Sequence, residues 1–218
     1  MTPRIVIVGG SLGGLRAAEQ LRVHGWSGEL TVVGAEAHLP YNRPPLSKNV
    51  LVAPDASALS ATELVNYPGV ALRRRAHVED VSWVTGTEVT GAVLADRVVH
   101  TANGRTLAYD GLVVATGLRP RRLPIDGFGS QRHVLRTLDD AIALREQLTT
   151  GASVVVVGGG FIGCEVAPVP AAPDAASVSS SRSSHRCCAR SVPNSPRTLQ
   201  TFHEEQGVVF ELGRSVSA

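Results

Sequence analysis

A glycine-rich turn near the start of the chain has the residue types needed to bind a nucleotide phosphate. Gly9, Ser11 and Gly14 follow the G-x-G-x-x-G spacing, with serine replacing the middle glycine that lets a backbone approach a pyrophosphate. Serine is small, and its hydroxyl could itself contact a phosphate. Glu36 follows about 20 residues later, where a carboxylate would hold a ribose hydroxyl. The turn and the acid together favour nucleotide binding over an ordinary strand–helix connection.

A second glycine-rich turn has the unmodified form of the same spacing. Its three motif positions are Gly158, Gly160 and Gly163. One such motif by itself is weak evidence, because tight turns in ordinary α/β proteins also contain glycines. Two of them, about 150 residues apart, predict a protein that binds two nucleotides.

Regular elements on both sides of the first turn would hold it in place. Arg4–Val8 is a continuous apolar run, as expected for a strand that is buried on both faces. Apolar residues at helical spacing between 15 and 22 predict a helix, and Gly25 would end it. Leu30–Val33 is the second predicted strand. This order is one complete nucleotide-binding unit.

The middle of the chain predicts several short strands and then a capped helix. The strands are expected within 70–84, 88–101 and 109–117, the last being a buried, parallel type. Thr137 and Asp140 have the spacing of a capping box at the start of a helix. Ser153–Val157 is a further buried strand that leads into the second glycine-rich turn. The cysteine on the helix that follows, Cys164, is expected to be a small buried residue and not a nucleophile.

Composition excludes several classes of function. The chain has 218 residues, a net charge of +2 and 4% aromatic residues, so neither a nucleic-acid nor a membrane-surface partner is expected. No apolar run reaches the length of a membrane-spanning helix or a signal peptide, which favours a cytoplasmic protein. The three cysteines form no C-x-x-C pair, and the seven histidines have no metal-ligand spacing, so no metal is expected.

Four stretches, in the same order along the chain, resemble a known family. They are LPYNRPPLSK at 39–48, LVVATGLRPRRLP at 112–124, HVLRTLDDA at 133–141 and VVVVGGGFIGCEVA at 154–167. The chain resembles the FAD-dependent ferredoxin–NAD(P) reductases of the putidaredoxin and rubredoxin reductase type. The resemblance implies an α/β fold with two Rossmann-like nucleotide-binding domains, of which the second is incomplete. Residues 1–118 would bind FAD, and residues 119–218 would bind NAD(P)H.

The resemblance also implies roles for individual residues in binding FAD. Those expected to line the FAD pyrophosphate are Gly9, Ser11, Gly13 and Gly14. Glu36 would hold the adenosine ribose, and Arg43 and Lys48 would contact the flavin side. Val78 would offer backbone groups to the adenine, although core packing is its plainer interpretation, and Arg136 would reach the FAD. Without the motif, Arg43 and Lys48 would be ordinary surface charges.

The second nucleotide and the redox step have their own expected residues. Gly158, Gly160 and Gly163 would face the NAD(P)H pyrophosphate. Glu165 would pair with Lys48 beside the flavin, and the lysine would stabilise the reduced, anionic flavin. Electrons would pass from NAD(P)H through FAD to a ferredoxin-type iron–sulfur protein. The alternatives are a non-catalytic remnant with weak FAD binding and a nucleotide-binding interaction module, because the family has further segments beyond the position of residue 218.

Residues 168–195 interrupt the second unit. After the second turn and helix another apolar strand is due, but 179–193 read SSSRSSHRCCARSVP. With G/C-ending codons, reading 180–188 one base earlier permits Glu-Pro-Leu-Leu-Ala-Pro-Leu-Leu. Extended over about 176–195, the shifted frame permits an apolar strand that ends in this Glu, where a ribose-binding acid belongs. We therefore interpret 168–195 as a segment between two compensating frame errors, and sequencing the gene tests this. The other interpretation is a disordered serine- and arginine-rich insert, which could not order itself as a central strand.

Overall fold

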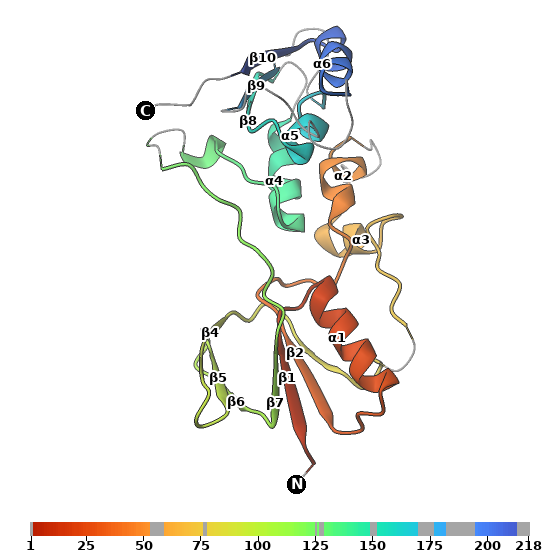
Figure 1. Ribbon diagram of the computed structural model, residues 1–218, viewed down its shortest axis with the longest axis vertical. Coiled ribbons are helices and arrows are strands. Elements are labelled where there is room, and N and C mark those ends of the chain that lie inside the picture. Colours follow the sequence, from red (N-terminus) through yellow and green to blue (C-terminus); the bar gives the residue numbers. More distant parts are fainter. Residues whose placement is uncertain are drawn as a thin grey trace. The chain divides into compact units, whose positions relative to one another are not determined.

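The computed structural model describes residues 2–52, 59–75, 78–124, 126, 129–148, 152–169, 177–181 and 195–212. The chain divides into two compact units, each made of two segments (Figure 1). Unit 1 consists of Met1–Arg43 and Thr62–Arg119, and unit 2 consists of Pro44–Ala61 and Pro120–Ala218. Both units contain a parallel sheet with helices, which confirms the predicted α/β class.

A four-stranded parallel sheet with the order β3-β2-β1-β7 forms the centre of unit 1. Its strands are β1 (Arg4–Val8), β2 (Glu29–Val33), β3 (Ser82–Val84) and β7 (Gly111–Val114). Ile7 lies opposite Val32 on one side and Val113 on the other. β1 has the predicted bounds, because its apolar run is buried between two neighbouring strands. β7 is only half-buried, which corrects the prediction of a buried strand, and Val114 at its end is 69% exposed.

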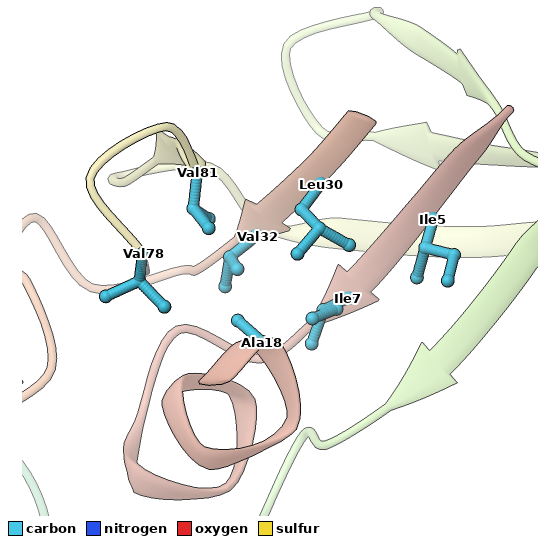
Figure 2. Close-up of a cluster of buried hydrophobic side chains, with 7 residues drawn as sticks. All are labelled: Ile5, Ile7, Ala18, Leu30, Val32, Val78 and Val81. Carbon is cyan, nitrogen blue, oxygen red and sulfur yellow. The ribbon is translucent and has the colours of Figure 1, made fainter. Parts of the chain in front are cut away.

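The helix α1 (Leu12–Val23) packs its apolar face against β1 and β2. Figure 2 shows the resulting cluster, in which Ala18 of the helix faces the strand residues. The buried members of this cluster are Ile5, Ile7, Ala18, Leu30, Val32, Val78 and Val81. Gly25, with a φ of 85°, lies two residues past the end of the helix, as predicted.

An antiparallel sheet accounts for the short strands of the middle region. Its order is β4 (Val89–Val93), β5 (Val98–Thr101) and β6 (Thr106–Ala108). Short strands were predicted within 70–84, and among the described residues of that stretch Ser82–Val84 alone forms a regular strand. Arg75, in the same stretch, contacts Glu19 of α1 through its backbone N–H and its guanidinium. A short helix, α3 (Ala61–Val65), precedes it.

Glu19 is a carboxylate with no exposed side-chain surface in the middle of α1. Arg16 Nη1 donates to Glu19 Oε2 at 2.5 Å, and the backbone N–H of Arg75 donates to Oε1 at 2.8 Å. Burial alone would raise the pKa of Glu19, but these hydrogen bonds and the charges of Arg16 and Arg75 together hold the pKa below its ordinary value. Glu19 therefore joins Arg75 to α1.

We expect Glu19→Gln to lower the free energy of unfolding by about 1–3 kcal/mol at pH 7, because the variant loses hydrogen bonds made by a buried charge. A lowered pKa means that the ionised form stabilises the fold above the unfolded value of 4.5 and that this contribution is lost as the pH falls through the folded value. The difference between the two proteins should therefore shrink in acid. Urea unfolding at several pH values measures it.

Glu29→Gln is the matched control, because Glu29 is 52% exposed and pairs with a 41% exposed Arg4 at 2.7 Å. An exposed pair contributes about 0–1 kcal/mol, so this change should alter stability much less than Glu19→Gln. Equal losses from the two changes at pH 7 would contradict the role of Glu19.

Unit 2 is built around a second parallel sheet with the order β10-β9-β8. The strands are β8 (Val154–Val157), β9 (Ser177–Ser181) and β10 (Val208–Leu212), with α5 (Phe161–Val166) after β8 and α6 (Ser195–Glu205) before β10. The other helical elements of this unit are η1 (Pro44–Ser47), α2 (Asn49–Val52), η3 (Gly129–Gln131) and α4 (Leu138–Gln147). α4 begins with the predicted capping box between Thr137 and Asp140.

β9 corrects the prediction that a strand is missing from the second unit. Ser177–Ser181 forms a central strand that pairs in parallel with both neighbours, and Val157 lies opposite Ser180. The hydrogen bonds of a sheet are made by backbone groups, so two flanking strands can order a serine-rich segment despite its low strand propensity. The rest of the aberrant stretch, 170–176 and 182–194, lies outside the described residues.

β8 also differs from its prediction as a buried strand. Val155 and Val157 are 65% and 48% exposed, so alternate residues of the strand face solvent. β1 has a described neighbour on each side, whereas β8 pairs with β9 alone within the part of the chain that is described. The apolar run therefore identified a strand but not how deeply it is buried.

Candidate functional site

The first glycine-rich turn is shaped by contacts that leave no room for side chains. Gly9 has a φ of 124°, and a Cβ atom there would lie 2.0 Å from the carbonyl oxygen of Ala115. A Cβ on Gly14 would lie 2.0 Å from the carbonyl oxygen of Gly9. The helix α1 therefore starts close against the end of β1. This close approach is what a pyrophosphate site at a helix N-terminus requires.

Ser11 is the N-cap of α1, and its side chain makes no capping hydrogen bond. The first turn of the helix contains no acidic residue, so nothing there opposes a negatively charged group. Gly13 lies inside the helix, with an ordinary 3.6 Å between its added Cβ and the Ala115 Cβ. The turn thus has the shape and the electrostatics that a diphosphate needs.

The second glycine-rich turn repeats the same backbone geometry. Gly158 has a φ of 133°, and a Cβ on Gly163 would lie 2.0 Å from the carbonyl oxygen of Gly158, the same distance as between Gly14 and Gly9. Gly160 is the N-cap of α5, the position that Ser11 has in α1. The two motifs therefore form equivalent turns despite their different middle residue.

Glu36 and Arg43, which were predicted separately as FAD-binding residues, form one cluster with Tyr41. Arg43 Nη2 lies 2.5 Å from Glu36 Oε1, and the Tyr41 hydroxyl donates to Glu36 Oε2 at 2.5 Å. The Arg43 guanidinium also lies 5.2 Å from the centre of the Tyr41 ring. Each carboxylate oxygen keeps a second lone pair, so Glu36 can still accept a hydrogen bond from a ribose.

Lys48 and Glu165, the predicted redox pair, are brought together in unit 2. Lys48 Nζ lies 2.9 Å from Glu165 Oε2, although the lysine follows η1 and the glutamate belongs to α5. The buried Ser47 donates from Oγ to the same Oε2 at 2.5 Å. The carbonyl oxygen of Pro44 accepts from Lys48 Nζ at 3.2 Å.

These contacts determine the protonation of Glu165. Burial alone would raise the pKa of Glu165, but the hydrogen bonds from Ser47 and Lys48 and the positive charge of Lys48 outweigh it. The pKa of this carboxyl is therefore held below its ordinary value, and Glu165 is ionised at neutral pH.

The remaining predicted residues have more ordinary surroundings. The Val78 side chain is buried in the core cluster of unit 1, in agreement with the packing interpretation. Arg136 directly precedes the N-cap of α4, and its backbone N–H donates to Asp140 Oδ2 at 3.0 Å. Cys164 is buried, as predicted, with its sulfur 3.9 Å from the carbonyl oxygen of Gly159. Cys187 and Cys188 lie outside the described residues.

Two residues of the site, Tyr41 and Ser47, were not predicted from the sequence. Both are in the stretch LPYNRPPLSK. From this stretch the family resemblance assigned site roles to Arg43 and Lys48 only. A lone tyrosine or serine in a proline-rich loop has no spacing that indicates a polar contact. Their positions inside that motif were the one available signal.

The end of β9 lacks the carboxylate that Glu36 provides after β2. β9 ends with Ser180 and Ser181, and the sequence contains no Asp or Glu from 177 to 203. A carboxylate at the end of the second strand is the usual partner of an NAD ribose. The second site therefore has its glycine-rich turn but not its expected acid.

The described part of the chain contains neither a metal-binding cluster nor a membrane-spanning helix. No group of three or more His, Cys, Asp or Glu side chains there could hold a metal ion. None of the helices found there combines the length and the hydropathy needed to cross a membrane.

Two parallel sheets, each with a strand that leads through a glycine-rich turn into a helix, define an α/β protein with two nucleotide-binding turns. Residues 3–218 match the pyridine nucleotide-disulphide oxidoreductase family, and the chain belongs to this family. Its members use FAD and NAD(H). The match confirms the resemblance that was drawn from LPYNRPPLSK and the other three stretches.

The relatives are ferredoxin reductases of oxygenase systems. The chain is 44% identical over 167 residues to the ferredoxin–NAD(+) reductase component of the p-cumate 2,3-dioxygenase system of Pseudomonas putida, an alignment with 75% of this chain and 39% of that protein. It is 36% identical over 218 residues to the reductase component of the anthranilate 1,2-dioxygenase system of Burkholderia cepacia, covering 95% of this chain and 49% of that protein.

A solved structure supports the same assignment. The fold matches a chain of the covalent putidaredoxin reductase–putidaredoxin complex with a TM-score of 0.83 and 32% identity, covering 99% of this chain and 51% of that one. The chain thus spans about half, or less, of the length of the relatives it matches.

Proposed function

We propose that the protein is an FAD-dependent oxidoreductase that passes electrons from NAD(P)H through FAD to a ferredoxin-type iron–sulfur protein. The observation that carries this proposal is the pair of equivalent glycine turns, at Gly9–Gly14 and at Gly158–Gly163, in a member of this family. Each turn suits the diphosphate of one cofactor, the first that of FAD and the second that of NAD(P)H. The reductase names of the relatives support the direction of electron flow and the class of partner.

Unit 1 is the proposed FAD-binding part of the chain, and unit 2 the NAD(P)H-binding part. The first turn would hold the FAD pyrophosphate, and Glu36 would hold the adenosine ribose while Arg43 and Tyr41 fix its carboxylate. Val78 would offer backbone groups to the adenine. Arg136 would also contact FAD. The cytoplasm is the proposed location, because FAD- and NAD(P)H-dependent electron transfer draws on cytoplasmic cofactors.

When bound, the flavin supplies the hydride-accepting and single-electron chemistry of the reaction. The chain's own contribution lies in charge and position. Lys48 presents an ammonium group that is held by Glu165 and by the carbonyl oxygen of Pro44, and a fixed cation stabilises negative charge where it develops. The ionised Glu165 holds that ammonium group in place.

The second candidate is a non-catalytic remnant that binds FAD weakly. The serine-ended β9, with no carboxylate at the expected place, favours it. The two candidates differ in whether NAD(P)H reduces the bound flavin. Loss of the flavin absorption band near 450 nm under anaerobic conditions would indicate the reductase, and its persistence would indicate the remnant.

FAD binding should depend on Lys48 and on Arg43. Each change to alanine removes a positive charge, and charge-assisted hydrogen bonds contribute about 1–3 kcal/mol, so we expect affinity to fall about 5- to 150-fold in each variant. Titration of FAD fluorescence with protein measures the affinities. Arg105→Ala, on an exposed turn of unit 1, is the control and should bind FAD as the unchanged protein does. Equal affinities in all four proteins would contradict the assignment.

A further inference from the structure

The hydroxyl of Ser47 has a position that the predicted roles of Lys48 and Glu165 do not explain. Ser47 is 5% exposed at the end of η1, and its Oγ lies 2.5 Å from Glu165 Oε2. The next nearest acceptor is the carbonyl oxygen of Pro44, at 3.4 Å. A hydroxyl has one proton to donate, and the shorter contact shows that it goes to the carboxylate.

Ser47 and Lys48 share one oxygen of the carboxylate. Glu165 Oε2 accepts from Ser47 Oγ and lies 2.9 Å from Lys48 Nζ. The lysine side chain is 49% exposed and the glutamate side chain 32% exposed, so an ion pair alone would be weak and mobile in water. The buried serine is the rigid member of the three. The Ser47 hydroxyl fixes the carboxylate of Glu165 in the orientation in which its Oε2 contacts Lys48 Nζ.

We propose that Ser47 is a positioning residue: its buried hydroxyl holds the Glu165 carboxylate turned toward Lys48, and so fixes the direction of the ammonium group. The proposal rests on the proposed function, in which Lys48 stabilises negative charge on the flavin. Ser47 contacts neither cofactor in this account and acts through Glu165. Among the described residues, the charge that acts on the pKa of Glu165 is that of Lys48. The effect of Ser47 on this pKa therefore has to be distinguished from the effect of Lys48 alone.

The test measures the pKa of the Glu165 carboxyl by carbon NMR on the full chain without cofactor. In Ser47→Ala the carboxylate loses a hydrogen-bond donor, which raises its pKa, so we expect the value to move toward that of an ordinary glutamate. Ser47→Thr retains a hydroxyl and should keep the low pKa. Ser47→Cys retains the size with a weak donor, so it should also raise the pKa, and it serves if the alanine variant does not fold.

A merely structural role of Ser47 would lower the melting temperature without moving the pKa of Glu165. An unchanged pKa in folded Ser47→Ala and Ser47→Cys would therefore overturn the proposal. FAD titration of the same variants gives the second measurement, with a smaller loss of affinity in Ser47→Ala than in Lys48→Ala. Because the NMR experiment needs no cofactor, a protein that fails to bind FAD would overturn the proposed function and leave the contact between Ser47 and Glu165 tested.

Discussion

NADH is expected to bind the unchanged chain about 10- to 100-fold more weakly than one of two variants that place a carboxylate at the end of β9. A hydrogen bond to a charged group contributes about 1.5–3 kcal/mol, and the unchanged strand ends in Ser180 and Ser181. Neighbouring residues of a strand point to opposite faces, so Ser180→Glu and Ser181→Glu are made as two separate variants. The variant whose carboxylate lies on the side of the nucleotide should bind NADH more tightly. Isothermal titration calorimetry measures the affinities.

Ser177→Glu is the matched control, because it places the same charge at the opposite end of the same strand. It should leave NADH affinity unchanged, since nucleotides bind at the carboxyl ends of parallel strands. NADPH carries an extra phosphate, which a new carboxylate repels, so the favourable variant should not gain affinity for NADPH. Tight binding of NADH by the unchanged chain, equal to that of both variants, would contradict the prediction. Replacing 168–195 with the shifted-frame sequence should also restore NADH binding.

Gly14→Ala is expected to destabilise unit 1 by at least about 1–3 kcal/mol. The new Cβ would lie 2.0 Å from the carbonyl oxygen of Gly9, so α1 must move away from the end of β1, and overpacking of a tight contact has a cost of this size. The surroundings of Gly9 are tight as well, because a Cβ there would lie 2.0 Å from the carbonyl oxygen of Ala115. Thermal and urea unfolding of the two proteins measure the loss, and outright unfolding of the variant would agree with it.

Gly13→Ala provides the comparison at the neighbouring position. Its Cβ would lie 3.6 Å from the Ala115 Cβ, an ordinary contact, and alanine is favoured over glycine inside a helix by up to about 1 kcal/mol. This variant should be as stable as the unchanged protein or slightly more stable. If Gly13→Ala and Gly14→Ala were equally stable, the close approach of α1 to β1 would not be what requires glycine.

The sequence predicted elements best where local pattern and burial agree. β1 was predicted with its correct bounds because an apolar run between two strands has few alternatives, and the start of α4 was predicted because Thr137 and Asp140 have the spacing of a capping box. β9 was missed because its five residues, SVSSS, have little preference for a strand. Its order comes from the backbone groups of β8 and β10, which no local pattern reveals.

The candidate site was predicted in part. The glycine positions, Lys48 and Glu165 could be found because spacing and the family motif mark them. Tyr41 and Ser47 were missed, since the polar contact that each makes depends on a partner placed by the fold. Glu19 was missed for the same reason, because a buried carboxylate in a helix is recognisable only when Arg16 and the Arg75 backbone are seen beside it.

The discontinuous make-up of the two units affects the order in which the chain can fold during synthesis. Pro44–Ala61 belongs to unit 2, whose other segment begins at Pro120, so this segment leaves the ribosome long before the residues that it packs against. Ser47 must wait for a partner 118 residues further along the chain. Until then Leu46, Val50 and Leu51, which are buried in the folded protein, are exposed to chaperones and to aggregation. The contact between Ser47 and Glu165 therefore cannot form until 118 residues after Ser47 have been made.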